Sequence, residues 1–264
     1  MDTLSPPQLQ SAILETLPAF WLAYAERNPK AEHLDFEGAE AVSFGLPHPL
    51  FNLVLRSEQL TDEQVTAVCR AMDHRRLPWM WCGQPTSYLS SLRHQLATKG
   101  FEPFTMPGMA LDMSETLPER PAVSGLEIRE ALDMVSLEAF NKAILPAYDM
   151  PAEFGVFFTT AHSNGGFFPD FPARIFYGIH AGRPVCGSMV FYDKEVAAIQ
   201  CVGTHPDARG KGFARAVVIE CLHAAREQGY RYAVLHASEV GFPIYTRLGF
   251  ETCFHQDCFL RSQQ

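Results

Sequence analysis

A glycine-containing loop between two strongly patterned segments limits what this chain can fold into. Residues 195–203 (EVAAIQCVG) precede the loop and predict a largely buried strand. Residues 211–228 follow it and predict an amphipathic helix, because apolar residues recur there at three- and four-residue spacings. That apolar face is made of Ala214, Val217, Val218, Cys221, Leu222 and Ala225. We therefore expect a strand–loop–helix unit.

The loop has the chemistry of an anion site. Gly210 and Gly212 are small enough for a ligand to approach the backbone closely. The first N–H groups of the following helix have no partner inside the helix, and the helix dipole favours negative charge beside them. Positive charge is added by Arg209, Lys211 and Arg215. Together these features predict a phosphate-binding loop.

Neither of two common phosphate loops matches these residues. The GK[ST] ending of a Walker loop is missing, and Gly210-Lys211-Gly212 is followed by Phe213-Ala214-Arg215 rather than by the GxGxxG pattern. Taken alone, the loop is about equally compatible with a glycine-rich turn that binds nothing. The neighbouring motifs therefore have to distinguish a phosphate-binding loop from a turn without a ligand.

Two motifs together resemble the GNAT superfamily of N-acetyltransferases. Arg209-x-x-Gly212-x-Ala214 resembles the family's [Q/R]-x-x-G-x-[G/A] motif and stands, as there, between a strand and a long helix. Residues 235–238 (LHAS) and 243–250 (PIYTRLGF) resemble the family's next strand and its YxxLGF helix, at a fitting spacing. The resemblance covers roughly residues 126–264. It implies an α+β or α/β fold with a mixed, mostly antiparallel sheet flanked by helices.

The resemblance also implies how acetyl-CoA would bind as a cosubstrate. In the family, the loop amides hold the pyrophosphate; the matching residues are Arg209, Gly210, Lys211, Gly212, Phe213 and Ala214. The strand before the loop diverges from its neighbour, and its backbone, here near Val202 and Thr204, pairs with the pantetheine arm. Ser238 matches a position, often asparagine, that contacts the pantetheine, so the serine is a departure from the pattern.

The family reaction is direct attack of an amine on the acyl thioester in a ternary complex. Tyr245 matches the tyrosine that often protonates the departing thiolate. A lysine-like amine costs roughly 4–5 kcal/mol to deprotonate at pH 7, so it needs a base or a water chain. Glu195 is the nearest match to the family's occasional glutamate base, but it is about one residue out of place. A solvent-exposed hairpin glutamate is the alternative.

Other residues near the motifs have structural alternatives. His236 would end a strand near the site, where a lone histidine is more often structural than catalytic, and His205 could simply begin the loop. Cys201 could carry an acyl group, but a small buried apolar residue is the stronger interpretation. A run of phenylalanines could line an acyl or acceptor pocket or pack in the core. It consists of Phe154, Phe157, Phe158, Phe167, Phe168 and Phe171.

The two halves of the chain share an ending. Gly100-Phe101-Glu102 and Gly249-Phe250-Glu251 each follow a predicted helix and precede a predicted strand, which indicates a duplicated fold; coincidence over three residues is the alternative. Residues 114–125 contain two prolines and predict a linker. We expect a degenerate GNAT-like lobe at 1–113, which lacks the Arg-x-x-Gly-x-Ala loop and binds no CoA. The catalytic domain is expected at 126–264.

Composition excludes several functions. The net charge of -9 argues against a nucleic-acid partner. The seven cysteines include no C-x-x-C pair, and several stand in apolar runs, so we expect free thiols and no metal site. The N-terminal residues do not resemble a signal peptide, and no apolar stretch reaches the ~18–20 residues of a membrane span. A cytoplasmic location is expected, and the oligomeric state stays open.

These features favour an N-acetyltransferase that moves an acetyl group from acetyl-CoA to an amine. The acetyl group is chosen on family frequency. A small amine, an amino acid, an antibiotic and a protein or peptide amine all remain open as acceptors. The alternatives are a non-catalytic acyl-CoA sensor and an interaction protein that uses the degenerate lobe. Tyr245 favours the enzyme, because a protein that only binds acyl-CoA would not need it.

Overall fold

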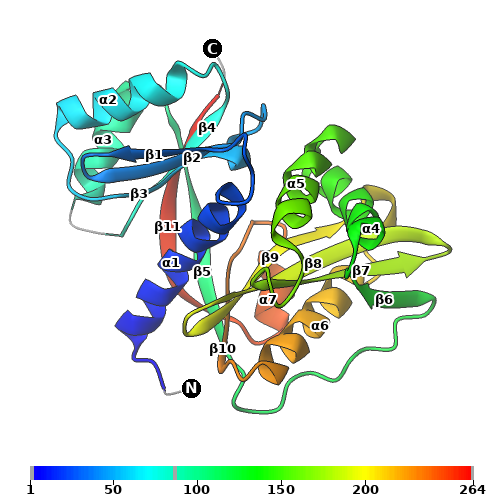
Figure 1. Cartoon of the computed structure of the whole chain (residues 1–264). Coiled ribbons are helices and arrows are strands. Elements are labelled where there is room, and N and C mark those ends of the chain that lie inside the picture. Colours follow the sequence, from blue (N-terminus) through cyan, green and yellow to red (C-terminus); the bar gives the residue numbers. More distant parts are fainter. Residues whose placement is uncertain (1–2, 86–87, 263–264) are drawn as a thin grey trace. The chain divides into compact units, whose positions relative to one another are not determined.

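A computed structural model describes residues 3–85 and 88–262, which form two compact units (Figure 1). Unit 1 combines the described residues up to Thr16 with Met109–Cys253. Unit 2 combines Leu17–Gly108 with the described residues from Phe254 onward. The chain therefore passes from one unit to the other within helix α1 (Pro6–Ala25), strand β5 (Glu102–Asp112) and strand β11 (Glu251–Arg261).

Unit 2 contains a small sheet with the strand order β1-β2-β3-β4-β11. Its first part is an antiparallel meander of the strands β1 (Glu32–Phe36), β2 (Ala39–Ser43) and β3 (Asn52–Ser57). Helix α2 (Asp62–Asp73) follows and leads to β4 (Trp79–Cys82), which is parallel to β3. The short helix η1 (Pro49–Phe51) precedes β3, and helix α3 (Leu89–Thr98) follows β4. Thr61 starts α2 through a capping box with Gln64. Strand β11 adds antiparallel to β4.

Unit 1 contains the larger sheet, with the strand order β5-β10-β9-β8-β7-β6. Strands β6 (Leu126–Glu130), β7 (Ala173–His180), β8 (Arg183–Asp193) and β9 (Val196–Thr204) are antiparallel, and β10 (Tyr232–His236) is parallel to β9. The segment between β6 and β7 holds α4 (Met134–Ile144), η2 (Leu145–Tyr148), η3 (Ala152–Gly155) and α5 (Val156–Gly165). After β9 come η4 (Pro206–Ala208), α6 (Phe213–Glu227) and, beyond β10, α7 (Phe242–Arg247). The expected mixed, mostly antiparallel sheet with flanking helices is confirmed.

The order of elements repeats in the two halves of the chain. An antiparallel meander, a helix, a parallel strand, a helix and a final strand occur as β1-β2-β3-α2-β4-α3-β5 and again as β7-β8-β9-α6-β10-α7-β11. Each final strand pairs with a strand of the other half, because β5 lies beside β10 and β11 beside β4. The matching Gly-Phe-Glu endings thus stand at equivalent points of a repeated topology.

The compact units do not coincide with the expected domains 1–113 and 126–264. The exchange of final strands is the physical reason, because it moves the residues from Phe254 onward into unit 2 and Met109–Asp112 into unit 1. Residues 114–125 are also more than a spacer. Leu117 is 6% exposed and belongs to the core of unit 1, against which Val123 packs.

Helices cover both faces of the sheet in unit 1, with α4 and α5 on one side and α6 on the other (Figure 1). Gly187 and Gly203 let α4 approach closely, since a Cβ on Gly203 would lie 3.0 Å from the Cβ of Ala147 and 3.3 Å from the Cα of Ile144. Most of the phenylalanine run belongs to the core, because Phe154, Phe157, Phe158 and Phe171 are all buried. All seven cysteines are free. Among the described residues, no helix is both long and apolar enough to cross a membrane.

Candidate active site

Strand β9 parts from β10 just before the glycine loop. The two strands pair only from Val196 to Ala198, whereas β9 continues to Thr204. Its other edge stays paired with β8, where Ser188 faces the two residues Cys201 and Val202. Cys201 has φ 53°, a left-handed conformation that costs a non-glycine residue roughly 1–3 kcal/mol. A strained bulge of this kind bends the strand and re-aims its backbone, here at the point where the sheet opens.

The loop after β9 presents an open helix N-terminus. Gly210 and Gly212 have φ 78° and 79°, and a Cβ on either would meet no heavy atom within 4 Å. Gly212 is the N-cap of α6 and has no side-chain capping bond; the first i→i−4 bond runs from Ala216 N to Gly212 O. The amides of the first turn therefore face free space, as an anion site requires. Phe213 is 2% exposed and packs in the core, so only its backbone faces the loop.

The basic residues of the loop differ in what they do. Arg209 folds back, and its side chain donates to the carbonyls of Thr204 at 3.4 Å and Ala147 at 3.2 Å. Lys211 and Arg215 are exposed, and neither forms an ion pair within residues 3–85 and 88–262. Arg209 thus ties the loop to η2, while the other two cations remain available beside the helix N-terminus. His205 caps η4 by accepting from Asp207 N at 3.4 Å, which supports its structural interpretation.

Helix α7 places Tyr245 in the apolar core of unit 1. The side chain is 7% exposed, and its ring packs edge-on against Phe250 at 5.9 Å. Burial raises the pKa of Tyr245 above its usual value of 10, so the phenol keeps its proton at neutral pH. Ser238 lies just before α7, where its Oγ accepts from Gly241 N at 3.1 Å and so helps to start the helix.

Tyr148 is a site residue that the sequence did not reveal. It ends η2, and its hydroxyl donates to the carbonyl of Val202 at 3.0 Å. Burial raises the pKa of Tyr148 well above 10, with smaller contributions from Cys201 and Tyr245. The residues before Tyr148 follow no strand or helix period, and no motif points to this position. The bond to Val202 fixes the backbone at the bulge.

Two further groups near the opening are held in their neutral forms. Burial lowers the pKa of His236, at the end of β10, to about 4. Burial likewise raises the pKa of Cys201 to about 12. At neutral pH the imidazole is unprotonated, and the thiol is a poor nucleophile because it is not ionised. The acyl-cysteine alternative is therefore disfavoured on chemical grounds.

Glu195 is not brought together with the other predicted residues. It is exposed in the turn between β8 and β9, at the opposite end of β9 from the glycine loop. At about 3.3 Å per residue, the strand separates these two ends by roughly 25 Å. Glu195 instead lines a surface pocket with Lys194 and the first turns of α1. This distance disfavours the expected role of Glu195 as the base and agrees with the alternative of a solvent-exposed hairpin glutamate.

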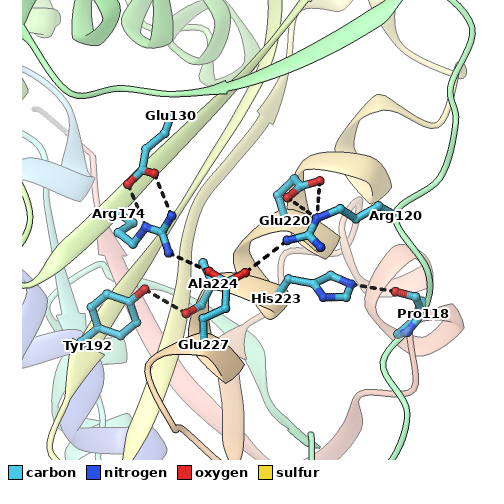
Figure 2. Close-up of polar contacts among 9 residues, drawn as sticks. All are labelled: Pro118, Arg120, Glu130, Arg174, Tyr192, Glu220, His223, Ala224 and Glu227. Carbon is cyan, nitrogen blue, oxygen red and sulfur yellow. Dashed lines mark hydrogen bonds and ion pairs between the residues drawn. The ribbon is translucent and has the colours of Figure 1, made fainter.

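The expected linker, residues 114–125, contacts α6 through ion pairs and a hydrogen bond (Figure 2). Figure 2 shows the guanidinium of Arg120 beside the carboxylates of Glu220, at 2.8 Å, and Glu227, at 3.4 Å. Glu227 also pairs with Arg174, while His223 Nε2 lies 3.0 Å from the carbonyl of Pro118. Each exposed ion pair of this kind contributes little to stability. Together they hold the linker, residues 114–125, along α6, the helix that begins at the glycine loop.

The described part of the chain contains no cluster of three or more histidine, cysteine, aspartate or glutamate residues that could hold a metal ion.

Comparison with known proteins agrees with this geometry. Residues 193–253 match a family model described as an acetyltransferase (GNAT) domain. No curated protein matches the sequence. Among solved structures, a GCN5-related N-acetyltransferase from Kribbella flavida superposes with a TM-score of 0.66 at 16% identity, over 96% of each chain.

Two other solved structures are similar over most of their length. A GCN5-related N-acetyltransferase-like protein from Streptococcus suis has a TM-score of 0.58 at 13% identity, over 96% of this chain and 100% of that one. A tandem GNAT protein from the clavulanic acid biosynthesis pathway has a TM-score of 0.54 at 13% identity, over 95% of each chain. The chain thus shares the fold of these solved structures, and its residues 193–253, from the end of β8 to the start of β11, match the GNAT acetyltransferase domain model.

Proposed function

We propose that this protein transfers an acetyl group from acetyl-CoA to an amine. The observation that carries the proposal is the open N-terminus of α6, with two positive-φ glycines and free space over its amides, directly after a strand that has parted from its neighbour. A pyrophosphate fits that place, since it needs unpartnered N–H groups, the positive end of a helix and no side chain in the way. Lys211 and Arg215 would add charge attraction.

The other predicted residues would bind acetyl-CoA or supply a proton to its departing thiolate. The backbone of β9 near Val202 and Thr204 would pair with the pantetheine arm along the opened edge. Tyr148 would hold the Val202 carbonyl in place. Tyr245 would donate a proton to the departing thiolate, for which a phenol with a raised pKa remains protonated and available. Ser238 is placed to start α7, so its contribution to donor binding would be secondary.

No carboxylate base is part of the proposed site, since Glu195 lies at the far end of β9. An acceptor amine would therefore arrive neutral or lose its proton to water. An α-amine with a pKa near 8 costs only about 1 kcal/mol to deprotonate at pH 7, against roughly 4–5 kcal/mol for an alkyl amine. We accordingly favour acceptors with weakly basic amines over lysine-like amines.

The test is a thiol-release screen with acetyl-CoA against a panel of amines graded by pKa. Acetylated product and free CoA should appear in equal amounts with at least one acceptor, preferentially of low pKa. Calorimetry should give one acetyl-CoA site per chain. Binding without thiol release across the panel would favour the sensor, and no binding at all would favour the interaction protein.

A further inference from the structure

Two buried cysteines lie directly opposite each other in unit 2. Cys82 ends β4, and Cys258 lies in β11; the antiparallel register of the two strands pairs these residues. Both side chains are 0% exposed. The proposed transferase function uses neither residue. They are 176 positions apart in the sequence (258 − 82), a separation that no spacing motif would connect.

The register gives this pair the geometry of a cross-strand bridge. Gly83 N donates to Asp257 O at 2.8 Å, so the neighbouring pair, Gly83 and Asp257, is the hydrogen-bonded one. Cys82 and Cys258 therefore form a non-hydrogen-bonded pair, in which the Cα atoms are about 4.5 Å apart and the side chains share a face. Disulfides span Cα separations of about 4.4–6.8 Å. The register therefore places the two Cα atoms within the range that a disulfide can span.

The two thiols belong to residues that face each other across the paired strands. Their interaction, together with burial, raises the pKa of Cys258 well above its usual value. Because both thiols are buried, an oxidant reaches them slowly, and the folded chain keeps both sulfurs reduced until local opening admits one. The two thiols are close together but shielded from solvent. They should therefore react only when the end of β11 separates from β4 and admits an oxidant.

We propose that Cys82 and Cys258 are an oxidation site that forms a reversible disulfide with hydrogen peroxide as the oxidant. The proposal is independent of the transferase function. Peroxide first converts one thiol to a sulfenic acid and releases one water; the second thiol then attacks that sulfur, the S–S bond forms and a second water leaves. The two thiols lose two electrons and two protons, and the peroxide is reduced to two waters. The product ties β11 covalently to β4.

The experiment treats the full chain with hydrogen peroxide, blocks remaining thiols by alkylation and maps the peptides by mass. Trypsin leaves Cys253 and Cys258 on one peptide, 248–261, so chymotrypsin is added to cut at Phe254 between them. The expected product is a linked peptide joining Cys82 to Cys258, about 2 Da lighter than the two separate peptides. Dithiothreitol should reverse it. Urea below the unfolding midpoint should speed its formation, because the strand end opens more often.

A matched control is Cys69→Ala, which removes another buried cysteine of the same unit. The linked peptide should persist in Cys69→Ala and disappear in Cys258→Ala. The decisive result comes from the unaltered chain, so a poorly folding variant cannot obscure it. Oxidation confined to the exposed Cys253, or a link between any other two cysteines, would overturn the proposal.

Discussion

Replacing Gly212 with leucine would fill the free space over the first turn of α6. Gly212 has φ 79°, and no heavy atom lies within 4 Å of the position where its Cβ would be. A Cβ at this position would therefore meet no obstacle in the protein itself. It would stand beside the amides that we assign to the pyrophosphate, so it should block the ligand while leaving the fold in place.

The cost to stability can be derived from the backbone. A non-glycine residue in the left-handed region costs roughly 1–2 kcal/mol, and no clash adds to it. The midpoint of thermal unfolding should fall by roughly 2–8 °C, at about 2–4 °C per kcal/mol for a chain of this size. Acetyl-CoA affinity should fall at least ~100-fold, which corresponds to about 2.7 kcal/mol.

Gly229→Leu is the matched control, because it lies just beyond the other end of the same helix. Gly229 has φ 82°, and its Cβ position is equally open, so the strain is similar. Its stability loss should therefore match that of Gly212→Leu, with acetyl-CoA affinity unchanged in calorimetry. Normal affinity in Gly212→Leu would refute the placement of the donor, and an equal loss in both variants would show that strain alone weakens binding.

Three further outcomes follow from the two tyrosines and from His236. Tyr245→Phe should keep stability and acetyl-CoA affinity but lower turnover by about 10²–10⁴ in a thiol-release assay, because it keeps the ring and removes only the hydroxyl that would supply the proton. Tyr148→Phe deprives the Val202 carbonyl of its donor and should cost about 1–2 kcal/mol in urea unfolding. His236 has a folded pKa of about 4, lowered by burial from 6.5. The unfolded chain thus binds the proton more readily, and stability should fall by up to roughly 3 kcal/mol as pH drops through this window. His236→Asn should remove that part of the pH dependence.

The sequence predicted the parts of this fold that depend on local patterns. The apolar face of α6 and the glycines before it identify the strand–loop–helix unit, because helical period and backbone freedom are properties of neighbouring residues. Glu195 shows the limit of such reasoning. A shift of one residue in register moves a side chain to the other face of a strand. The turn that places Glu195 far from the glycine loop depends on where β8 ends.

Long-range features could not be predicted in this way. The hydroxyl of Tyr148 reaches the carbonyl of Val202 because α4 packs on β9. Gly203 has no side chain at this contact, so Ala147 can approach the strand closely. The exchange of β5 and β11 likewise depends on partners far along the chain, which no local pattern specifies. Residues 114–125 have the composition of a linker, yet Arg120 and Leu117 bind them to α6 and to the core.

The position of β11 in the sheet affects how the chain can be synthesised and folded. Strand β4 is made early, but its antiparallel partner follows every other strand described, so their contacts have a very large sequence separation. Such non-local pairing slows folding. Until β11 arrives, one edge of β4 exposes unpaired N–H and C=O groups, a template on which other chains can add. A nascent chain of this protein should therefore depend most on chaperone protection in the interval before β11 is synthesised, when β4 is formed but still lacks this partner.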